Sequence, residues 1–152
     1  MIFIGIDPGK AGSISIINQN GSLEVFPVPI INDDYDMEGM YQLLKSYDLD
    51  SFVVLERAQA MPGQGVVSMF NFGVGYGLWK MALTCAKIPF QIIHSRTWTK
   101  TMLLGASGEG KDRAVSVAKL LFPSWQPKLK KELQYADSIL LAEYGRRLKG
   151  GE

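Results

Sequence analysis

Two apolar stretches that lie far apart in the sequence each end in a carboxylate. Residues 2–6 (IFIGI) are followed by Asp7, and residues 51–55 (SFVVL) are followed by Glu56. Both stretches have the length and composition of buried strands. An ionised carboxylate at the end of a buried strand is costly unless a positive charge compensates it. If the two strands are neighbours in one sheet, Asp7 and Glu56 lie side by side and need more compensation.

A third acid, Asp137, lies in the helical segment ADSILLAEYGRR near the C-terminus. It shares a helix face with Leu140 and Leu141, so it is expected to point toward the sheet rather than toward water. Three carboxylates in one place repel each other unless divalent cations lie between them. Oxygen-rich sites of this kind suit Mg²⁺ or Mn²⁺. Two such ions about 4 Å apart serve the hydrolysis of phosphodiesters.

Each acid also has a simpler interpretation. A strand-end acid is often a helix cap or an ion-pair partner, and Asp7, which precedes a Pro-Gly pair, would also fit an Asx turn. The coincidence of two strand-end acids with one inward-facing helix acid favours a shared site. Among the remaining acids we expect Asp112 at the start of a helix, and Glu143 and Glu152 exposed on the last helix or the tail.

The elements that must position these acids are predicted from the spacing of apolar residues. Three strands come first, and the Asn20-Gly21 turn joins the second to the third. Helices and strands then alternate, which indicates a single α/β domain, 1–152: a mixed five-stranded sheet, three antiparallel strands followed by parallel ones, and helices on both faces. The predicted order is strands 2–7, 13–18 and 22–28, an exposed acidic loop 32–38, helix 37–47, strand 51–56, helix 67–86, strand 90–94, helices 97–103 and 111–121, and a last helix containing Ala136 and Ile139.

Composition excludes several classes of protein. The 152 residues are 47% hydrophobic and 20% charged, which is ordinary for a globular protein. No apolar run approaches the roughly 20 residues of a membrane span, and no signal peptide is recognisable, so we expect a cytosolic protein with no membrane partner. The single cysteine, Cys85, rules out an intrachain disulfide and is expected to be buried. Neither Cys85 nor His94 belongs to a zinc-ligand pattern.

Charge is distributed unevenly along the chain. Residues 1–60 carry three Lys or Arg against nine acids, and residues 61–152 carry thirteen against six. The basic excess lies chiefly in residues 87–131. Such asymmetry indicates either the binding of a polyanion or a solvated helix face.

Five stretches follow one another along the chain: IGIDPGKAGSISII, LERAQAMPGQGVVSMFNFGVGYGLW, TWTKTM, KDRAVSVAKLLFP and ADSILLAEYGRR. In this order they resemble the RuvC-type Holliday-junction resolvases of the RNase H-like superfamily, in particular the phage-type and chloroplast-type branch. The GIDPG motif alone is a weak signal. A strand-end Glu followed by a PGQG loop, a glycine-rich helix ending in GLW and the ADxxLLAEYGRR motif is a specific one. The resemblance covers most of the sequence.

This resemblance implies a metal-dependent endonuclease that resolves four-way DNA junctions by paired symmetric nicks, leaving 5′-phosphate and 3′-hydroxyl ends. It assigns Asp7, Glu56 and Asp137 as catalytic ligands of two Mg²⁺ ions, for which Mn²⁺ is expected to substitute. No small-molecule cofactor is expected.

The fourth metal ligand is less clearly marked. Bacterial members carry an acid or His three residues before the last acid, where this chain has Gln134. The phage and chloroplast branch carries one five residues before it, where this chain has Glu132, and we take Glu132 as the fourth ligand. Five residues correspond to about 140° around a continuous helix, so Glu132 reaches the metals only if the helix begins after it or is irregular there.

The resemblance also implies how DNA is bound. A four-way junction is two-fold symmetric, which calls for a symmetric homodimer. The expected interface is Gly73, Gly75 and Gly77, since small residues let two helices approach closely. In the family the loop after the strand-end Glu reaches the crossover, so Met61 and Gln64 are expected to contact DNA. The expected phosphate contacts are Lys111, Arg113, Lys128, Lys130 and Lys131, with Arg96, Trp98 and Lys100 flanking the scissile strand.

Other functions are compatible with parts of this pattern. Another RNase H-like nuclease would cut RNA–DNA hybrids or branched and flap DNA with the same acids; the PGQG loop and the glycine-rich helix argue against it. An actin-like kinase or Hsp70-type ATPase needs two such lobes, and 152 residues hold one. A non-catalytic junction binder is disfavoured by the intact set of acids. We expect a cytoplasmic, nucleoid-associated protein of bacterial or phage origin, or a plastid protein whose transit peptide has been removed.

Overall fold

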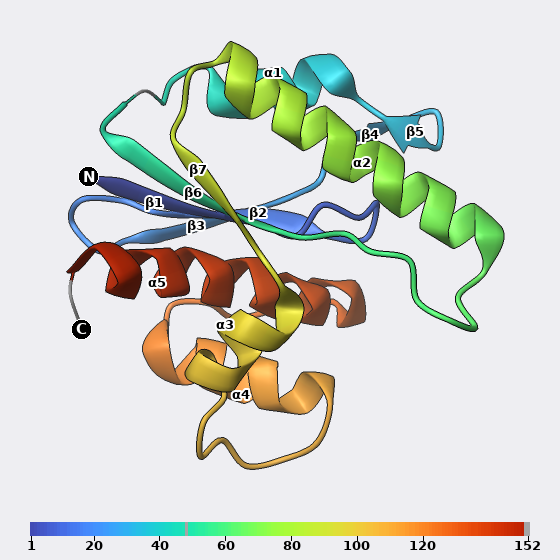
Figure 1. Ribbon diagram of the computed structural model, residues 1–152. Helices are drawn as coiled ribbons and strands as arrows, with labels where there is room; N and C mark the ends of the chain where they lie inside the picture. The colour runs from blue at the N-terminus through green and yellow to red at the C-terminus, as the bar shows by residue number, and fades with distance from the viewer. Residues whose placement is uncertain (48, 151–152) are drawn as a thin grey trace.

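The computed structural model describes residues 1–47 and 49–150, and a five-stranded sheet lies at its centre (Figure 1). The strand order is β3-β2-β1-β6-β7. β1, β2 and β3 pair antiparallel, whereas β6 pairs parallel with β1, and β7 pairs parallel with β6. The predicted mixed sheet is therefore confirmed. Its strands are β1 (Ile2–Ile6), β2 (Ser13–Ile17), β3 (Leu23–Pro27), β6 (Ser51–Glu56) and β7 (Phe90–Ile93).

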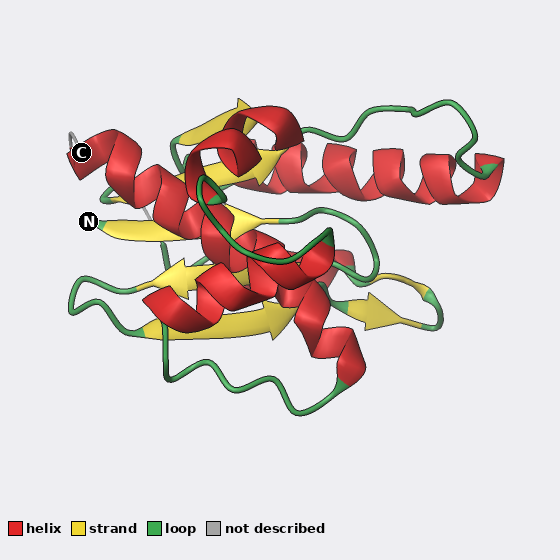
Figure 2. Cartoon of the chain, turned by 90° about the horizontal axis from the view of Figure 1, so that it is seen from below, coloured by secondary structure: helices red, strands yellow, loops and turns green. Residues whose placement is uncertain are grey.

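Helices cover both faces of the sheet, as predicted. On one face lie α1 (Met37–Leu44) and α2 (Val66–Cys85), and on the other lie α3 (Ser95–Met102), α4 (Lys111–Leu121) and α5 (Ala136–Gly150) (Figures 1 and 2). Successive side chains of a strand point to opposite faces. In β6, Val53 and Leu55 belong to the core beneath α2, and Phe52 and Val54 belong to the core beneath α5. Each face therefore has its own hydrophobic core.

The first turn of α5 packs directly on β1 and β2. It crosses β1 at Gly5, where a Cβ atom would overlap the backbone of α5. Beside this crossing, the hydroxyls of Ser13 and Ser15 each lie 2.6 Å from Ser138 Oγ, and the Ser138 hydroxyl donates to the carbonyl of Tyr135 at 3.0 Å. All three serines are fully buried. Because Ser138 donates its one proton to Tyr135, Ser13 and Ser15 are left as the donors to Ser138.

Local sequence explains the turn between β2 and β3. Gly21 adopts a φ of 82°, which the predicted Asn20-Gly21 turn requires. The backbone N–H of Ser22 donates to Asn20 Oδ1 at 2.9 Å, and this bond closes the turn.

Several element boundaries differ from the prediction. The acidic segment 32–38 contains β5 (Asp34–Tyr35), which pairs with β4 (Ile30–Ile31), so it is not simply an exposed loop. Asp36 then caps α1 by accepting from the backbone N–H of Gly39 at 2.9 Å. α3 begins at Ser95 rather than at 97, and a 3-10 helix, Lys130–Tyr135, precedes α5.

Two side chains have burial opposite to the prediction. Cys85, expected to be buried, is exposed at the end of α2. Glu143, expected to be exposed, is 1% exposed, and it accepts bonds of 2.7 Å from Arg146 Nε and 3.0 Å from Arg147 Nε. The two arginines compensate the charge that burial would otherwise destabilise. Glu152 lies outside the described residues. Over the described parts of the chain, no helix combines the length and the apolar character needed to cross a bilayer.

Candidate active site

Asp7 and Glu56 lie next to each other at the carboxyl ends of two adjacent parallel strands. The register pairs Ile6 of β1 with Leu55 of β6, and each acid comes one residue later. The alternation of side chains places both acids on the face that α5 covers. The backbone N–H of Asp7 donates to the carbonyl of Ser13 at 3.0 Å, which keeps this position attached to the sheet.

Asp137 reaches the same end of the sheet from the helical layer. It is the second residue of α5, and its neighbour Ser138 packs on Gly5, two residues before Asp7. Figure 1 shows the ends of β1 and β6 and the start of α5 at one end of the sheet, on the right of the view. The charge of Asp137 acts on both Asp7 and Glu56. The structure thus places the three acids that the sequence singled out close enough for their charges to act on one another.

Burial and mutual repulsion raise the pKa values of two of these carboxyl groups. The pKa of Asp7 is raised to about 6, chiefly by burial and then by the charge of Asp137; Lys111 and the backbone N–H of Gly9 oppose this. The pKa of Glu56 is raised to about 7 by burial and then by the charges of Asp7 and Asp137. The site therefore holds more negative charge than its own cation compensates.

Lys111, the first residue of α4, is a positively charged side chain that acts on all three acids. Its ammonium group forms an ion pair with Asp137, although the two residues are 26 positions apart in the sequence. It also lowers the pKa values of Asp7 and Glu56. We predicted Lys111 only as a phosphate contact, whereas the structure places it on a carboxylate of the site.

The chemistry of the three carboxylates fits a hard divalent cation. Their oxygens are the ligands that Mg²⁺ and Mn²⁺ prefer, and a cation would relieve the repulsion that raises the two pKa values. The arrangement is not closed around an ion: over the described residues, no three His, Cys, Asp or Glu groups stand together as a ready set of ligands. Asp137 is held by Lys111, so it would have to exchange that partner for a metal.

Glu132, predicted as the fourth ligand, lies in the 3-10 helix that precedes α5. The condition set by the sequence is met, because α5 begins after it, at Ala136. Its carboxylate nevertheless accepts bonds from the backbone N–H groups of Lys128 and Leu129, at 2.5 and 2.9 Å, and these bonds lower the pKa of Glu132. In this structure Glu132 caps its own segment and does not face the other acids. Gln134 is exposed in a separate groove that Lys10 and Lys131 also line.

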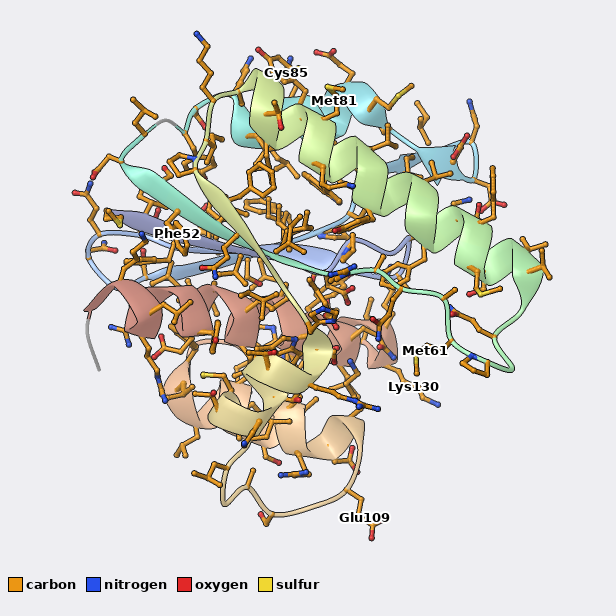
Figure 3. All side chains as sticks on the ribbon, in the orientation of Figure 1. Phe52, Met61, Met81, Cys85, Glu109 and Lys130 are labelled. Atoms are coloured by element: carbon orange, nitrogen blue, oxygen red, sulfur yellow. The ribbon has the colours of Figure 1, made fainter. Side chains whose placement is uncertain are left out.

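Two grooves open beside the carboxylates. The first, about 770 Å³, lies between the turn that follows Asp7 and the start of α2. The second, about 410 Å³, is lined by Glu56 together with Met61 and Arg96. Gln64 and Phe72 line both grooves. Met61, Gln64 and Arg96, all predicted to contact DNA, therefore lie at the groove that holds Glu56, and Figure 3 shows Met61 on the loop between β6 and α2.

Two contributors to this region were not predicted. The hydroxyl of Ser95 hydrogen-bonds Glu56 and lowers its pKa. Its signal in the sequence is a serine directly after a strand, which was missed because the helix was predicted to begin at 97. Phe72 packs against Gly9, where an added Cβ would lie 3.4 Å from its ring. His94 was predicted as a hydrogen-bonding residue at a strand end, and its Nε2 lies 3.2 Å from Arg57 Nη1.

The remaining predicted DNA contacts divide into accessible and buried side chains. Lys100, Lys128, Lys130 and Lys131 are exposed, and Arg113 is half-buried. Trp98 is 2% exposed and packs in the core beneath α5, so its prediction as a DNA contact is wrong. The reason is the phase of α3, which turns Trp98 and Met102 toward the sheet.

The three glycines of α2 do not share one surface. Gly75 faces inward, where a Cβ would overlap the carbonyl of Pro8 and the hydroxyl of Tyr35, so its prediction as part of a dimer interface is wrong. Gly73 and Gly77 border open space. On the same helix Phe70 and Met81 are 71% and 64% exposed. Figure 3 shows Met81 and Cys85 at the end of α2 that lies beside α1.

Comparison with known proteins identifies the fold. No protein-family model matches the sequence, and no curated protein matches it. The structure matches that of RuvC from Thermus thermophilus with a TM-score of 0.65 at 17% identity, over 99% of this chain and 97% of that chain. It also matches T. thermophilus RuvC in complex with a Holliday junction substrate, with a TM-score of 0.68 at 15% identity, over 99% and 96%. The chain therefore has the RuvC-type RNase H-like fold that its motifs predicted.

Proposed function

From the RuvC-type fold and the carboxylates at its sheet end, we propose that this protein is a divalent-metal-dependent endonuclease that resolves four-way DNA junctions. One observation carries the proposal. Asp7, Glu56 and Asp137 converge from two strands and a helix, and burial and repulsion raise the pKa values of Asp7 and Glu56. In a protein that bound no cation at this place, the repulsion among these carboxylates would destabilise the fold without serving a function. The neighbour that was solved with a Holliday junction supports the choice of substrate.

In this mechanism the carboxylates of Asp7, Glu56 and Asp137 hold the metals and do not act as general bases. When bound, two divalent cations supply an activated water and stabilise the departing 3′ oxygen in an in-line displacement. The Ser95 hydroxyl donates to Glu56, which orients the carboxylate and favours its ionised form by lowering its pKa. Lys111 neutralises Asp137 in the metal-free site, and a metal held by Asp137 would leave the ammonium group of Lys111 available to the phosphate backbone of the DNA.

The expected products are nicks with 5′-phosphate and 3′-hydroxyl ends, since water attacks phosphorus and the 3′ oxygen leaves. Phosphates of the arms would be bound by the exposed Lys128, Lys130 and Lys131, which position DNA without reading its sequence. Met61 and Gln64 line the groove beside Glu56 and would contact nucleotides near the cut.

A homodimer is part of the proposal, because a two-fold symmetric junction needs one active site for each strand it cuts. The outer face of α2 supports it. Gly73 and Gly77 are four residues apart and open, and Phe70 and Met81 lie exposed on either side of them along the helix. Small residues flanked by large apolar ones allow two helices to approach closely and to bury apolar area.

The proposal is tested by offering the protein a choice of labelled substrates in Mg²⁺ and in Mn²⁺. These are a synthetic four-way junction, a plain duplex, a flap and an RNA–DNA hybrid, with the Asp7→Asn variant as the control. We expect cleavage of the junction and none in the variant. Cleavage of the hybrid or the flap alone would reassign the protein to another nuclease of the same fold. Tight junction binding with no cleavage in either metal would make it a non-catalytic binder.

A further inference from the structure

A groove between α1 and α2 is lined mainly by sulfur-containing side chains. It measures about 220 Å³, and its lining includes Met37 and Met40 from α1 and Met81 and Cys85 from α2. The chain has seven methionines and one cysteine, so half of its sulfur-containing side chains line this one groove. We call it the sulfur-lined groove. The rest of its lining is Tyr41, Leu78 and Ala82.

The spacing along α2 brings two of the sulfurs together. Met81 and Cys85 are four residues apart and therefore lie on the same side of the helix; Figure 3 shows them close together at its end. The Cys85 thiol donates to Met81 Sδ, with 3.6 Å between the two sulfurs. A metal–sulfur bond is about 2.3 Å long, so two sulfur ligands of one three- or four-coordinate ion lie about 3.7–4.0 Å apart. The two sulfurs are therefore already close to the separation that a shared metal ion requires.

Most of these side chains are accessible from solvent. Met37 and Met81 are each 64% exposed, and Cys85 is exposed as well. Met40 is 1% exposed and belongs to the core beneath α2. Methionine usually fills gaps in apolar cores. Core packing thus accounts for Met40 but not for the two exposed methionines that face the same groove from different helices.

The lining of the groove favours a soft monovalent cation. Of the residues that the structure describes, no His, Asp, Glu, Lys or Arg lines it, so Mg²⁺ and Mn²⁺ lack the oxygen ligands that they prefer. Zinc sites and iron–sulfur clusters use several thiolates or imidazoles, whereas Cys85 is the single cysteine of the chain. One thiolate with thioethers suits Cu(I). A thiolate and Cu(I) are neutral together, and an uncharged groove accepts a neutral pair at less cost than a net charge.

We propose that the sulfur-lined groove is a Cu(I) site whose ligands are the thiolate of Cys85 and the thioethers of Met81 and Met37. The Cys85 thiol loses its proton to the solvent as the sulfur–copper bond forms, so copper takes the place of the proton between Cys85 and Met81. Met37 binds the same ion from the first turn of α1. Bound copper therefore joins the two helices of this face.

The sulfur-lined groove is remote from the carboxylates. α2 has 20 residues and is about 30 Å long, and Cys85 is at the opposite end from the loop that follows Glu56. Copper binding here does not depend on the proposed nuclease function, whose cations prefer oxygen ligands.

Competition with a coloured Cu(I) chelator tests the site. Copper is kept reduced with ascorbate in the absence of oxygen, and bicinchoninate reports the Cu(I) that the protein does not hold. We expect the wild type to bind one Cu(I) per chain and Cys85→Ser to lose tight binding. Met37→Leu and Met81→Leu should each bind at least roughly tenfold more weakly, since even the outer partners of metal ligands contribute this much. Leucine keeps an apolar side chain of similar size, so these variants remove a sulfur without emptying the groove.

Met61→Leu is the matched control, because Met61 is 50% exposed and does not line the sulfur-lined groove. It should bind Cu(I) as the wild type does. The site is overturned if the wild type retains no copper against the chelator. It is overturned equally if Met37→Leu or Met81→Leu binds as tightly as the wild type, because the Cys85 thiol alone would then hold the ion. An equal loss in Met61→Leu would assign the binding to exposed methionines in general.

The methyl resonances of ¹³C-labelled methionines locate the ion directly. Ag⁺, a soft monovalent ion that is not oxidised by air, is added in place of Cu(I). We expect the methyl groups of Met37 and Met81 to shift until one equivalent is bound, while that of Met61 does not shift. In Cys85→Ser the same shifts should require more Ag⁺. An unshifted Met37 or Met81, or a Met61 that shifts with them, would overturn the site.

Both measurements are made without nucleic acid, so they are separate from the nuclease assay. Copper held in the groove by a protein that cuts no junction would contradict the proposed function and leave the Cu(I) site standing. Junction cleavage by a protein that holds no copper would do the reverse.

Discussion

The pKa values of Asp7 and Glu56 are raised to about 6 and about 7 because both groups are buried close to other carboxylates. Lys111, which is paired with Asp137, lowers both pKa values but does not offset the increase. At the scale of the residue the site is therefore strained electrostatically in the metal-free protein. A divalent cation would compete with protons for the same oxygens, so metal affinity should rise as the pH rises toward neutrality.

The raised pKa values predict how the metal-free protein responds to pH. Between pH 4 and 7 the folded state binds more protons at Asp7 and Glu56 than the unfolded state, so stability falls as the pH rises. The contribution of Glu56 is fully present below about pH 4.5 and is lost as the pH passes through about 7. Urea unfolding in EDTA from pH 4.5 to 8 should show wild type losing stability relative to Glu56→Gln. A constant difference between the two proteins would contradict the raised pKa.

The Asp7→Asn variant separates function from stability. Cleavage should fall by roughly 100-fold or more, since a metal ligand is removed. The metal-free variant at pH 7.5 should be more stable than the wild type by about 1–3 kcal/mol, because burial and repulsion penalise the ionised carboxylate of Asp7 and one pKa unit corresponds to about 1.4 kcal/mol of this penalty. Asp112→Asn, an exposed acid in the first turn of α4, is the control for loss of a charge. A destabilised Asp7→Asn would make Asp7 a structural turn residue instead.

At the scale of the element, the inner and outer faces of α2 differ in what they contact. Gly75 packs on the carbonyl of Pro8 and the hydroxyl of Tyr35, and this hydroxyl also donates to the carbonyl of Asn71 at 2.7 Å. The inner face therefore holds α2 against the turn that follows Asp7. Gly73 and Gly77 face outward and are available to a second copy.

Matched alanine substitutions distinguish these faces. Gly75→Ala should destabilise the monomer by about 1–3 kcal/mol through overpacking. Gly77→Ala has room for its methyl group and should stabilise the isolated helix by about 0.5–1 kcal/mol. In the proposed dimer Gly77→Ala should nevertheless weaken association. This is measured by sedimentation-equilibrium ultracentrifugation alongside thermal unfolding. An unchanged dimer constant would exclude the outer face of α2 as the interface.

The start of α5 depends on the buried serines. In Ser138→Ala the hydroxyls of Ser13 and Ser15 lose their acceptor, which should cost about 1–3 kcal/mol for each donor left unsatisfied. Urea unfolding should show this loss beside an Ser124→Ala control, whose serine is exposed. Because Ser138 follows Asp137, cleavage should fall as well. A loss no larger than that of the control would mean that the hydroxyl cluster does not fix α5.

Periodicity was sufficient to predict the sheet and the convergence of its acids. The alternation in β1 and β6 is a local property, and parallel neighbours end at the same edge. By contrast, which side of a short helix faces the core depends on how the helix packs against the rest of the protein, and not on its own sequence alone. The two-residue error at the start of α3 left Ser95 outside the predicted helix, and the side that α3 turns to the core, and so the burial of Trp98, follows from its packing on the sheet. The pair of Lys111 with Asp137, and the capping role of Glu132, arise from contacts and turns that no spacing rule reports.

At the scale of the whole molecule, the carboxylates lie beside two grooves that share Gln64 and Phe72 as lining residues. The exposed face of α2 offers a place for a second copy. A symmetric pair of such chains would present two sites to a two-fold symmetric substrate. Cutting should then be paired rather than single.

The most direct measurement is the cleavage of a supercoiled plasmid that extrudes a cruciform, in Mg²⁺, with the products separated by gel electrophoresis. Paired nicks across one junction linearise the plasmid, and a ligase can seal their 5′-phosphate and 3′-hydroxyl ends. We predict linear product from the wild type, nicked circles from dimers in which one copy carries Asp7→Asn, and no cleavage when both copies carry it. A plasmid left supercoiled by the wild type, or converted by it only to nicked circles, would contradict a dimeric junction-resolving nuclease.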